Sequence, residues 1–428
     1  MGNVINKLSG LLNMSSKKKY FIIVVLLMVA GCSNGKLEKN VAFQVQRLDF
    51  PFVAGSGEPN LHAGEDGKLY ISWVEPISES EHALRFSFLG DKEWSQPVTI
   101  AQGKNWFVNW ADFPAFVTWQ NGRKAAHWLQ KSGPGAYAYD VKIARSNDDL
   151  NWQLPVTPHR DGTETEHGFV SMLPWFDDQL FCVWLDGRKY AKSAHNDNDT
   201  RSGVDEMTLR FALISETGQL LDEQILDERV CDCCPTDAVK TSDGALVVYR
   251  DRSEKEIRDI FIVSYRDGKW SEPRAVFRDN WKIEGCPVNG AAIDAIDAQV
   301  VVAWMTMAND TPAVNVTFSA SAGWDFGEAI RIDDGNPVGR VDVVLLADHS
   351  AAVSWLETTE SGAELRVRRV SREGLLLDSQ TVAESRQERA SGFPKMVYYD
   401  HKLFFCWTKT DSSTSVQTAF MELPVGTN

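Results

Sequence analysis

The chain has 428 residues, with 59 acidic and 44 basic side chains and a net charge of −15. A surface of this sign repels polyanions, which argues against nucleic acid and against anionic membrane surfaces as partners. The length exceeds that of one ordinary hydrophobic core, so an internally repeated fold or several domains are expected.

The first 31 residues have the pattern of an export signal. Three lysines at 17–19 precede an apolar run at 20–30 that is too short to span a membrane. Residues 1–31 contain four lysines and no acidic residue, so their removal takes the net charge from −15 to −19. The polar residues 33–40 are expected to form a tether.

The residues Val29-Ala30-Gly31-Cys32 resemble the lipobox of bacterial lipoproteins. The resemblance implies cleavage before Cys32 and attachment of a lipid to its thiol, with residues 32–40 as the lipidated tether. The alternative is an ordinary export signal in which Cys32 occurs by chance. Ser33, at the position that governs sorting in such lipoproteins, implies the outer membrane. The expected location is therefore the cell envelope, on its periplasmic or its surface face.

Strands are expected from residue 41 onward, and no amphipathic helix is evident. After a first strand at 41–50, a four-strand plan repeats about every 50–55 residues, with one longer step at the third repeat. Each repeat has a strand of small residues, a strand that ends near a tryptophan, a third alternating strand and an outer strand. The repeats start near Glu58, Asp112, His167, Cys234, Cys286, Arg340 and Ser391.

The seventh repeat has room for only three strands. We expect the strand at 41–50 to complete it, because this closes the ring and removes an exposed sheet edge. The sequence therefore predicts one all-β domain over residues 41–428, a β-propeller with seven blades, or with six if the repeats are divided too finely.

Two turns, Trp94-Ser95-Gln96-Pro97 and Trp270-Ser271-Glu272-Pro273, resemble the BNR repeats of sialidase-like propellers. Shortened Asp-box stretches at 146–152 (SNDDLNW) and 264–270 (SYRDGKW) carry the same resemblance. It covers most of the mature chain and implies a glycan-binding protein or an exo-glycosidase with a saccharide ligand. It also implies a substrate carboxylate held by three arginines and, as in sialidases, a tyrosine nucleophile.

The arginine set that this resemblance implies is incomplete. Glu58 stands where the first arginine is expected, and a carboxylate there repels an anionic sugar. Other arginines are candidates for a cationic ligand site, with salt bridges on loops as the alternative: Arg188, Arg250, Arg252 and Arg340. Tyr249 is a candidate nucleophile if it faces the central pocket, and otherwise packs between sheets.

Polar residues at the blade starts are candidates for the site, because the first strand of each propeller blade lines the central channel. Glu58, Asp112 and Glu166 are candidate catalytic carboxyl groups, and His167 is a candidate ligand-binding residue. The segment 158–169 (PHRDGTETEHGF) joins the second and third blades. Its histidines and acids suit acid–base chemistry or metal binding, and the alternative is a solvated connection.

Four cysteines gather at two neighbouring blade starts, with Cys231, Cys233 and Cys234 at the fourth and Cys286 at the fifth. In an oxidising compartment two disulfides would use all four. Cys286 would pair with Cys234 or with Cys233, and Cys231 with the remaining one. The alternative is a copper or zinc site, which His167 would help to complete.

Two tryptophans and two further cysteines lie outside the blade starts. Trp106 and Trp110 lie outside the positions at which tryptophan recurs in the repeats, so they are candidates for an aromatic wall beside a ligand. Cys182 and Cys406 lie within strongly apolar second strands, and we expect them in the core.

Three functional hypotheses follow from these patterns. The BNR-like repeats favour an envelope-anchored propeller that binds or hydrolyses glycans. The convergence of cysteines with a histidine favours a periplasmic metal or redox protein. A scaffold for a protein partner is a common use of propellers, although no separate feature of the sequence supports it.

Overall fold

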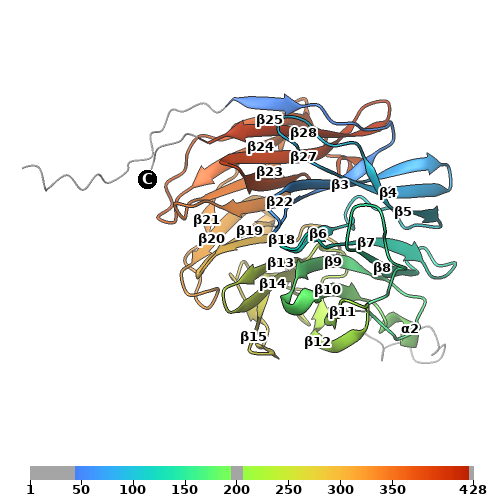
Figure 1. Ribbon diagram of the computed structural model, residues 1–428. Coiled ribbons are helices and arrows are strands. Elements are labelled where there is room, and N and C mark those ends of the chain that lie inside the picture. The colour runs from blue at the N-terminus through green and yellow to red at the C-terminus, as the bar shows by residue number, and fades with distance from the viewer. Residues whose placement is uncertain (1–43, 194–205, 424–428) are drawn as a thin grey trace, which may run out of the picture. The chain divides into compact units, whose positions relative to one another are not determined.

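Seven antiparallel sheets, arranged as the blades of a β-propeller, make up the described part of the chain (Figure 1). The computed structural model describes residues 44–193 and 206–423. They all belong to a unit that spans residues 40–425. The predicted all-β fold with seven blades is confirmed, and the alternative of six blades is wrong. The expected export signal, Cys32 and the tether lie outside the described residues.

The first three blades take their strands in chain order from the channel outward. Blade one contains β2 (Gly57–Ala63), β3 (Leu69–Ser78), β4 (Glu81–Phe88) and β5 (Val98–Lys104). Blade two contains β6 (Phe116–Thr118), β7 (Lys124–Lys131) and β8 (Tyr139–Ser146). Blade three contains β9 (His167–Pro174), β10 (Leu180–Asp186), β11 (Met207–Ile214) and β12 (Leu220–Val230).

The next three blades follow the same plan. Blade four contains β13 (Asp237–Thr241), β14 (Gly244–Arg250), β15 (Ile260–Arg266), β16 (Lys269–Trp270) and β17 (Arg274–Ala275). Blade five contains β18 (Ala291–Ile296), β19 (Gln299–Thr306), β20 (Ala313–Ser319) and β21 (Ile330–Arg331). Blade six contains β22 (Pro337–Leu345), β23 (Ala351–Thr359), β24 (Gly362–Val370) and β25 (Gln380–Ser385).

Blade seven joins the two ends of the described chain. It contains β26 (Lys395–Tyr399), β27 (Lys402–Thr410), β28 (Thr414–Glu422) and, as its outer strand, β1 (Val45–Leu48). β1 pairs antiparallel with β28, with Val45 opposite Met421, and Figure 1 shows the blue strand beside the red one. The predicted closure by the N-terminal strand is therefore confirmed, and it covers an edge that would otherwise expose unpaired backbone groups.

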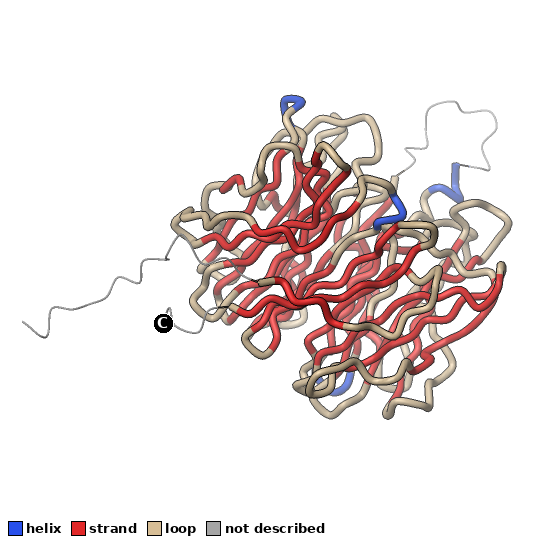
Figure 2. The backbone as a smooth tube through the Cα atoms, turned by 90° about the horizontal axis from the view of Figure 1, so that it is seen from above, coloured by secondary structure: helices blue, strands red, loops and turns tan. Residues whose placement is uncertain are grey.

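Helical structure is minor among the described residues, and strands dominate the backbone in Figure 2. The helical segments are α2 (Tyr190–Ser193), η2 (Phe176–Asp178), η3 (Ala308–Asp310) and η4 (Arg389–Ser391). None of them is long and apolar enough to cross a membrane.

The innermost strands form a closed ring around the channel. β2, β6, β9, β13, β18, β22 and β26 each contact the innermost strand on either side, and β26 contacts β2. Aspartate side chains tie these strands together by accepting a backbone N–H from the next blade. The pairs are Asp112 with Phe169 (2.7 Å), Asp237 with Ile293 (2.9 Å), Asp294 with Leu345 (2.7 Å) and Asp342 with Met396 (2.8 Å).

The hydrophobic core lies between the blades. The second strands of five blades each place a fully buried tryptophan there, namely Trp73, Trp184, Trp304, Trp355 and Trp407. These large side chains dominate the burial of apolar area between neighbouring sheets. Cys182 and Cys406 are buried free thiols on β10 and β27, as expected from the apolar strands that carry them.

Candidate functional site

Four blade starts carry a residue other than glycine in the left-handed backbone region. They are Glu58 (φ 50°), Phe169 (φ 53°), Val288 (φ 48°) and Arg340 (φ 54°). The strand register shifts beside Glu58 and beside Arg340, as in a β-bulge. Such conformations cost free energy and gather at functional sites, so the repeated distortion directs attention to this end of the channel.

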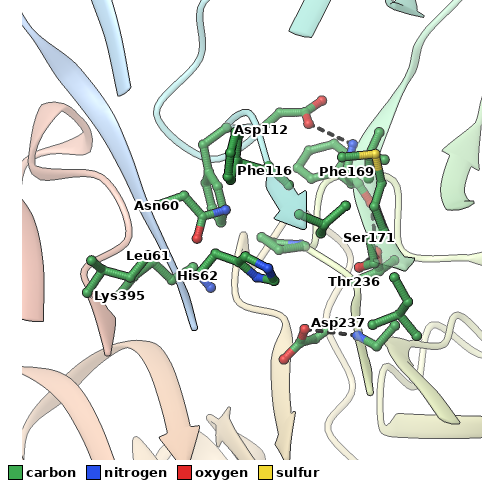
Figure 3. Close-up of a pocket in the computed structure, with 18 of the residues that line it drawn as sticks. Asn60, Leu61, His62, Asp112, Phe116, Phe169, Ser171, Thr236, Asp237 and Lys395 are labelled. Atoms are coloured by element: carbon green, nitrogen blue, oxygen red, sulfur yellow. Dashed lines mark hydrogen bonds between the residues drawn. The ribbon is translucent and has the colours of Figure 1, made fainter. Parts of the chain in front are cut away.

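A cavity of about 210 Å³ lies along the innermost strands of blades one to four and seven (Figure 3). Small-molecule sites usually measure about 300–1,000 Å³, so this cavity would take one group of a larger ligand. Its polar lining includes Asn60, His62, Asp112, Ser171, Asp237 and Lys395.

Lys395 supplies an ammonium group to this cavity. Its Nζ lies 5.0 Å from the centre of the Phe113 ring, and within the described residues it makes no hydrogen bond or ion pair. Its charge lowers the pKa of Asp237, which burial nevertheless raises to about 6. The ammonium group is therefore available to an anionic or hydroxyl-bearing ligand.

Two carboxyl groups meet one phenol where blades two and three adjoin. The Tyr139 hydroxyl lies 2.7 Å from Glu166 Oε1 and 3.1 Å from Asp112 Oδ2. Tyr139 is fully buried, Asp112 is 3% exposed, and Glu166 is the partly exposed member. We call these three residues the carboxyl–tyrosine cluster.

Close packing holds the cluster in place. The Tyr139 ring stacks on Phe107, with 4.0 Å between the ring centres. The Phe169 N–H fixes the other carboxylate oxygen of Asp112. A Cβ atom at Gly168 would collide with the Asp112 carboxylate and the Tyr139 ring, so only glycine allows β9 to approach this closely.

The cluster retains a proton near neutral pH. Burial raises the pKa of Asp112 to about 8 and that of Glu166 to about 7, and burial with the two neighbouring carboxylates raises the pKa of Tyr139 well above 10. The phenol has one hydrogen for two carboxyl groups, so a proton on one carboxyl completes the hydrogen bonding. The cluster titrates as a unit and can give or take a proton at neutral pH.

Asp112→Asn should change how stability depends on pH. The pKa of Asp112 is raised in the folded state, so its stabilising contribution is full below about pH 4 and is lost as the pH rises through about 8. An amide reproduces the hydrogen bonds of the protonated acid and does not titrate. Denaturant unfolding at pH 5 and pH 9 should show a smaller decline in the free energy of unfolding for Asp112→Asn than for the wild type. The exposed Asp91→Asn is the control, and equal declines would contradict the assignment.

Glu58, the other candidate carboxyl group, lies on β2 in blade one. Burial raises its pKa to about 7. Its carboxyl group makes no hydrogen bond or ion pair within the described part of the chain, and the residue does not line the cavity. A catalytic role for Glu58 stays a prediction.

Backbone carbonyl groups hold two of the four candidate arginines. The Arg250 guanidinium is buried and donates to the carbonyls of Asn289 (2.7 Å), Arg258 (2.6 Å) and Met305 (2.8 Å). Arg340 is buried, donates to the Gly392 carbonyl (2.9 Å) and lies 4.7 Å from the centre of the Trp110 ring.

Carboxylates hold the other two arginines. Arg188 forms a two-point pair with Asp186, with both distances 2.7 Å, and lies 3.0 Å from Asp161. Arg252 pairs with Asp232 and Glu256, each at 3.1 Å. Arg188 and Arg252 therefore form salt bridges, as the alternative stated. Each of the four guanidinium groups is bonded to its own partners within the protein, and no two of them share a partner among the described residues. Their binding of an anionic ligand stays a prediction.

Tyr249 packs between blades three and four. Its side chain is 1% exposed in the core there, and its hydroxyl donates to Asp227 at 2.6 Å. It does not line the cavity, so the condition set for its role as a nucleophile is not met. Tyr249 therefore packs between two sheets, which was the alternative to a nucleophile.

The four clustered cysteines form two disulfides. Cys231 is bonded to Cys234 within one loop, and Cys233 is bonded to Cys286 across the junction of blades four and five. The expectation of disulfides is confirmed, with one of the two pairings that the spacing left open. In this oxidised form the cluster has no thiolate to bind copper or zinc, so that alternative needs the reduced protein.

The two unusual tryptophans have different partners. The Trp106 ring lies 5.5 Å from Trp128, while the Trp110 ring lies 5.9 Å from Phe393. Among the described rings the two therefore form no shared wall. Trp110 and Phe393 instead stack beside Arg340 at the start of blade seven.

The sequence analysis did not identify six residues of the site, namely Asn60, His62, Tyr139, Ser171, Asp237 and Lys395. Tyr139 begins a third strand, a position that the repeat assigns to packing. Asp237 and Lys395 lie on innermost strands. Each is a charged residue in a short strand of otherwise mostly small or apolar residues (CPTDAVK and GFPKMVYY), and this contrast could have indicated a functional position. A comparison of charged residues at equivalent positions of the repeats could have identified the side chains that line the channel.

Comparisons with known proteins define the class of fold. No protein-family model and no curated protein sequence matches the chain. Polysaccharide lyase Uly1 is a similar solved structure, with a TM-score of 0.53 and 10% identity over 92% of this chain and 96% of that one. An ulvan lyase of family PL25 bound to -[GlcA(1-4)Rha3S]- has a TM-score of 0.54 and 12% identity over 88% and 95%.

A third similar structure is a protein of unknown function from Dyadobacter fermentans DSM 18053, with a TM-score of 0.50 and 12% identity over 90% of this chain and 98% of that one. At such identities the similarity shows the fold alone. It agrees with the propeller part of the sialidase-like resemblance, and the BNR character of the repeats stays a prediction.

Proposed function

We propose that this protein binds and cleaves a glycan at the channel end that carries the carboxyl–tyrosine cluster. The observation that carries the proposal is the pair of carboxyl groups, Asp112 and Glu166, that share the Tyr139 hydroxyl and keep a proton near neutral pH. Cleavage of a glycan by hydrolysis or by elimination needs a group that gives or takes a proton, and a pKa near the working pH favours that step.

Glu166 is the member of the cluster that could reach a substrate, because it alone is partly exposed. Of the three residues only Asp112 lines the cavity, so Glu166 would meet a substrate that extends beyond it. Tyr139 and Asp112 are positioning residues that set its protonation. The charge of Asp232 also raises its pKa, while the charge of His167 lowers it. In the cavity, the Lys395 ammonium group suits a hydroxyl, carboxylate or sulfate group of a saccharide.

The similar solved structures add support of a general kind. Two of them are described as polysaccharide lyases, and one is bound to a saccharide with glucuronate and a sulfated rhamnose. A propeller of this type therefore accommodates glycan chemistry. The products of cleavage distinguish a hydrolase from a lyase.

The test is a panel of neutral, uronate-containing and sulfated polysaccharides, applied to residues 33–428 exported without the lipid. We expect at least one of them to raise the melting temperature and to be cleaved. New reducing ends without an unsaturated product indicate hydrolysis, whereas ultraviolet absorbance of an unsaturated product indicates elimination. A panel without any binding or turnover would refute the proposal.

We also propose that the chain is anchored in the cell envelope through a lipid on Cys32. The support is the lipobox-like sequence and its basic and apolar leader. Growth with a labelled fatty acid should label the full chain and leave Cys32→Ser unlabelled, with Cys182→Ser as the control. Equal labelling of wild type and Cys32→Ser would contradict the anchor. Outer-membrane sorting and a protein partner stay predictions.

A further inference from the structure

The two disulfides differ in how far solvent reaches them. Cys286 is exposed and Cys233 is partly buried, whereas Cys231 and Cys234 are each 1% exposed. Exchange between a thiol and a disulfide needs access to a sulfur atom, and exposed disulfides are the labile, regulatory or catalytic ones. A reductant can therefore reach the bond between Cys233 and Cys286, while the core shields the other bond.

Three of the four sulfur atoms lie close together. Those of Cys231, Cys233 and Cys234 are all within 4.8 Å of one another. Cys233 thus belongs to one disulfide and lies beside both sulfur atoms of the other. A disulfide bond measures about 2.05 Å, so Cys233 Sγ needs to move by less than about 3 Å to bond to a new partner once its bond to Cys286 opens.

Cys231 is the partner that the local geometry favours. Adjacent Cα atoms are about 3.8 Å apart, below the distance of about 4.4–6.8 Å in ordinary disulfides, so Cys233 and Cys234 are poorly placed to bond to each other. The buried Arg258 guanidinium donates to Cys231 Sγ at 3.4 Å and pairs with Glu256 at 2.9 Å. A guanidinium beside a cysteine favours the thiolate, so Arg258 stabilises negative charge that approaches Cys231.

His167 stands apart from the cysteines. Its Nδ1 lies 3.2 Å from the Tyr139 carbonyl oxygen and 3.1 Å from that of Thr165, and its Nε2 lies 2.9 Å from Asp161. Both ring nitrogens therefore have partners. His167 offers no free nitrogen with which to complete a copper or zinc site at the reduced cysteines, so thiol–disulfide exchange is the chemistry that the cluster suits best.

We infer that the four cysteines form a thiol–disulfide exchange site that reacts with a dithiol through Cys286. A thiolate of the dithiol attacks Cys286 Sγ, a mixed disulfide forms, and Cys233 leaves with the electron pair of the broken bond. The second thiol of the dithiol then attacks the dithiol's own sulfur in the mixed disulfide and releases Cys286. The dithiol is oxidised to a disulfide, and its two protons pass to Cys286 and to the thiolate that remains.

The freed Cys233 then passes the reduction inward. Its thiolate attacks Cys231 Sγ, the bond between Cys231 and Cys233 forms, and the bond between Cys231 and Cys234 breaks. Cys234 leaves as a thiolate and takes up the proton. This step moves no electrons between molecules, so one disulfide remains, now between Cys231 and Cys233.

The exchange affects both neighbours of blade four. It opens the link between blades four and five, and it rebuilds the loop that carries Asp232 between Cys231 and Cys233. The Asp232 carboxylate pairs with Arg252 at 3.1 Å and accepts the N–H of Met207, which begins β11 in blade three, at 3.3 Å. The inference does not depend on the proposed glycan chemistry.

The test is partial reduction of residues 33–428, exported in the oxidised form, with dithiothreitol as the dithiol. The reaction is stopped with acid, free thiols are alkylated in denaturant, and mass spectrometry locates the labels. Cys182 and Cys406 are free thiols that take a label in every chain, so they serve as the internal standard. We expect the bond at Cys286 to open at least about 10-fold faster than the last disulfide, because access governs the rate.

The position of the second label tests the inward step. In protein that has lost one disulfide, Cys286 should be labelled in every chain, and the second label should divide between Cys233 and Cys234. Cys286→Ser leaves Cys233 unpaired, so the same division should appear without dithiothreitol. Cys231→Ser/Cys234→Ser is the matched control and should open its remaining bond at the wild-type rate.

Three results would overturn the inference. They are earlier opening of the bond between Cys231 and Cys234, equal rates for the two bonds, and a second label confined to Cys233 in both the wild type and Cys286→Ser. If Cys286→Ser does not fold, the time course of the wild type decides. The glycan panel needs no reductant, so the two proposals fail independently.

Discussion

Replacing Cys233 and Cys286 together by serine should lower the free energy of unfolding by about 4 kcal/mol. The two cysteines are 53 residues apart, and their bond joins the starts of blades four and five. The bond restricts the unfolded chain, and the chain-entropy model gives a loss of this size for a loop of that length. Denaturant unfolding of the oxidised, exported protein measures the difference.

The neighbouring disulfide provides a matched control. Cys231 and Cys234 are three residues apart, and the same model gives about 2 kcal/mol for so short a loop. The double variant Cys231→Ser/Cys234→Ser should therefore lose about half as much stability as the first one. Equal losses, or the reverse order, would contradict the pairing of Cys233 with Cys286.

The fold was largely predictable from the sequence because each blade repeats the same pattern. A short strand of small residues, then a strand that ends near tryptophan, recurs often enough to count the blades. The closure by β1 followed from physical reasoning, since the seventh repeat lacked a strand and the first segment had no partner. The disulfide pairing did not follow, because Cys233 and Cys234 are adjacent in the chain and spacing cannot tell which one faces blade five.

The site was predictable only in part. Asp112 and Glu166 were candidates because they stand at blade starts, but the contact between them passes through Tyr139 on the third strand of blade two. That contact depends on how far β8 and β9 approach, which the glycine at 168 permits and no periodic pattern reveals. Likewise, the partners of Arg250 are carbonyl groups, which every residue carries, so sequence alone could not assign them.

Glu166→Gln should lower kcat by about 10²–10⁴-fold on a glycan that the panel identifies, with little change in KM. The amide keeps the size of the side chain and can still accept a hydrogen bond from Tyr139, but it cannot transfer a proton. Because the pKa of Glu166 is about 7, the wild-type rate should fall as the pH rises through 7 if Glu166 acts as an acid. It should fall as the pH drops through 7 if Glu166 acts as a base.

Glu164→Gln is the matched control, because Glu164 is exposed and only two residues away. Steady-state kinetics from pH 5 to 9 should show the wild-type rate and profile for Glu164→Gln. They should show loss of the break near pH 7 for Glu166→Gln. Comparable activity in the two variants would remove Glu166 from the chemistry and direct the search to Lys395 and the channel lining. A lower rate with an unchanged pH break would assign Glu166 to binding. The rate depends on the protonation of a group only if that group transfers the proton.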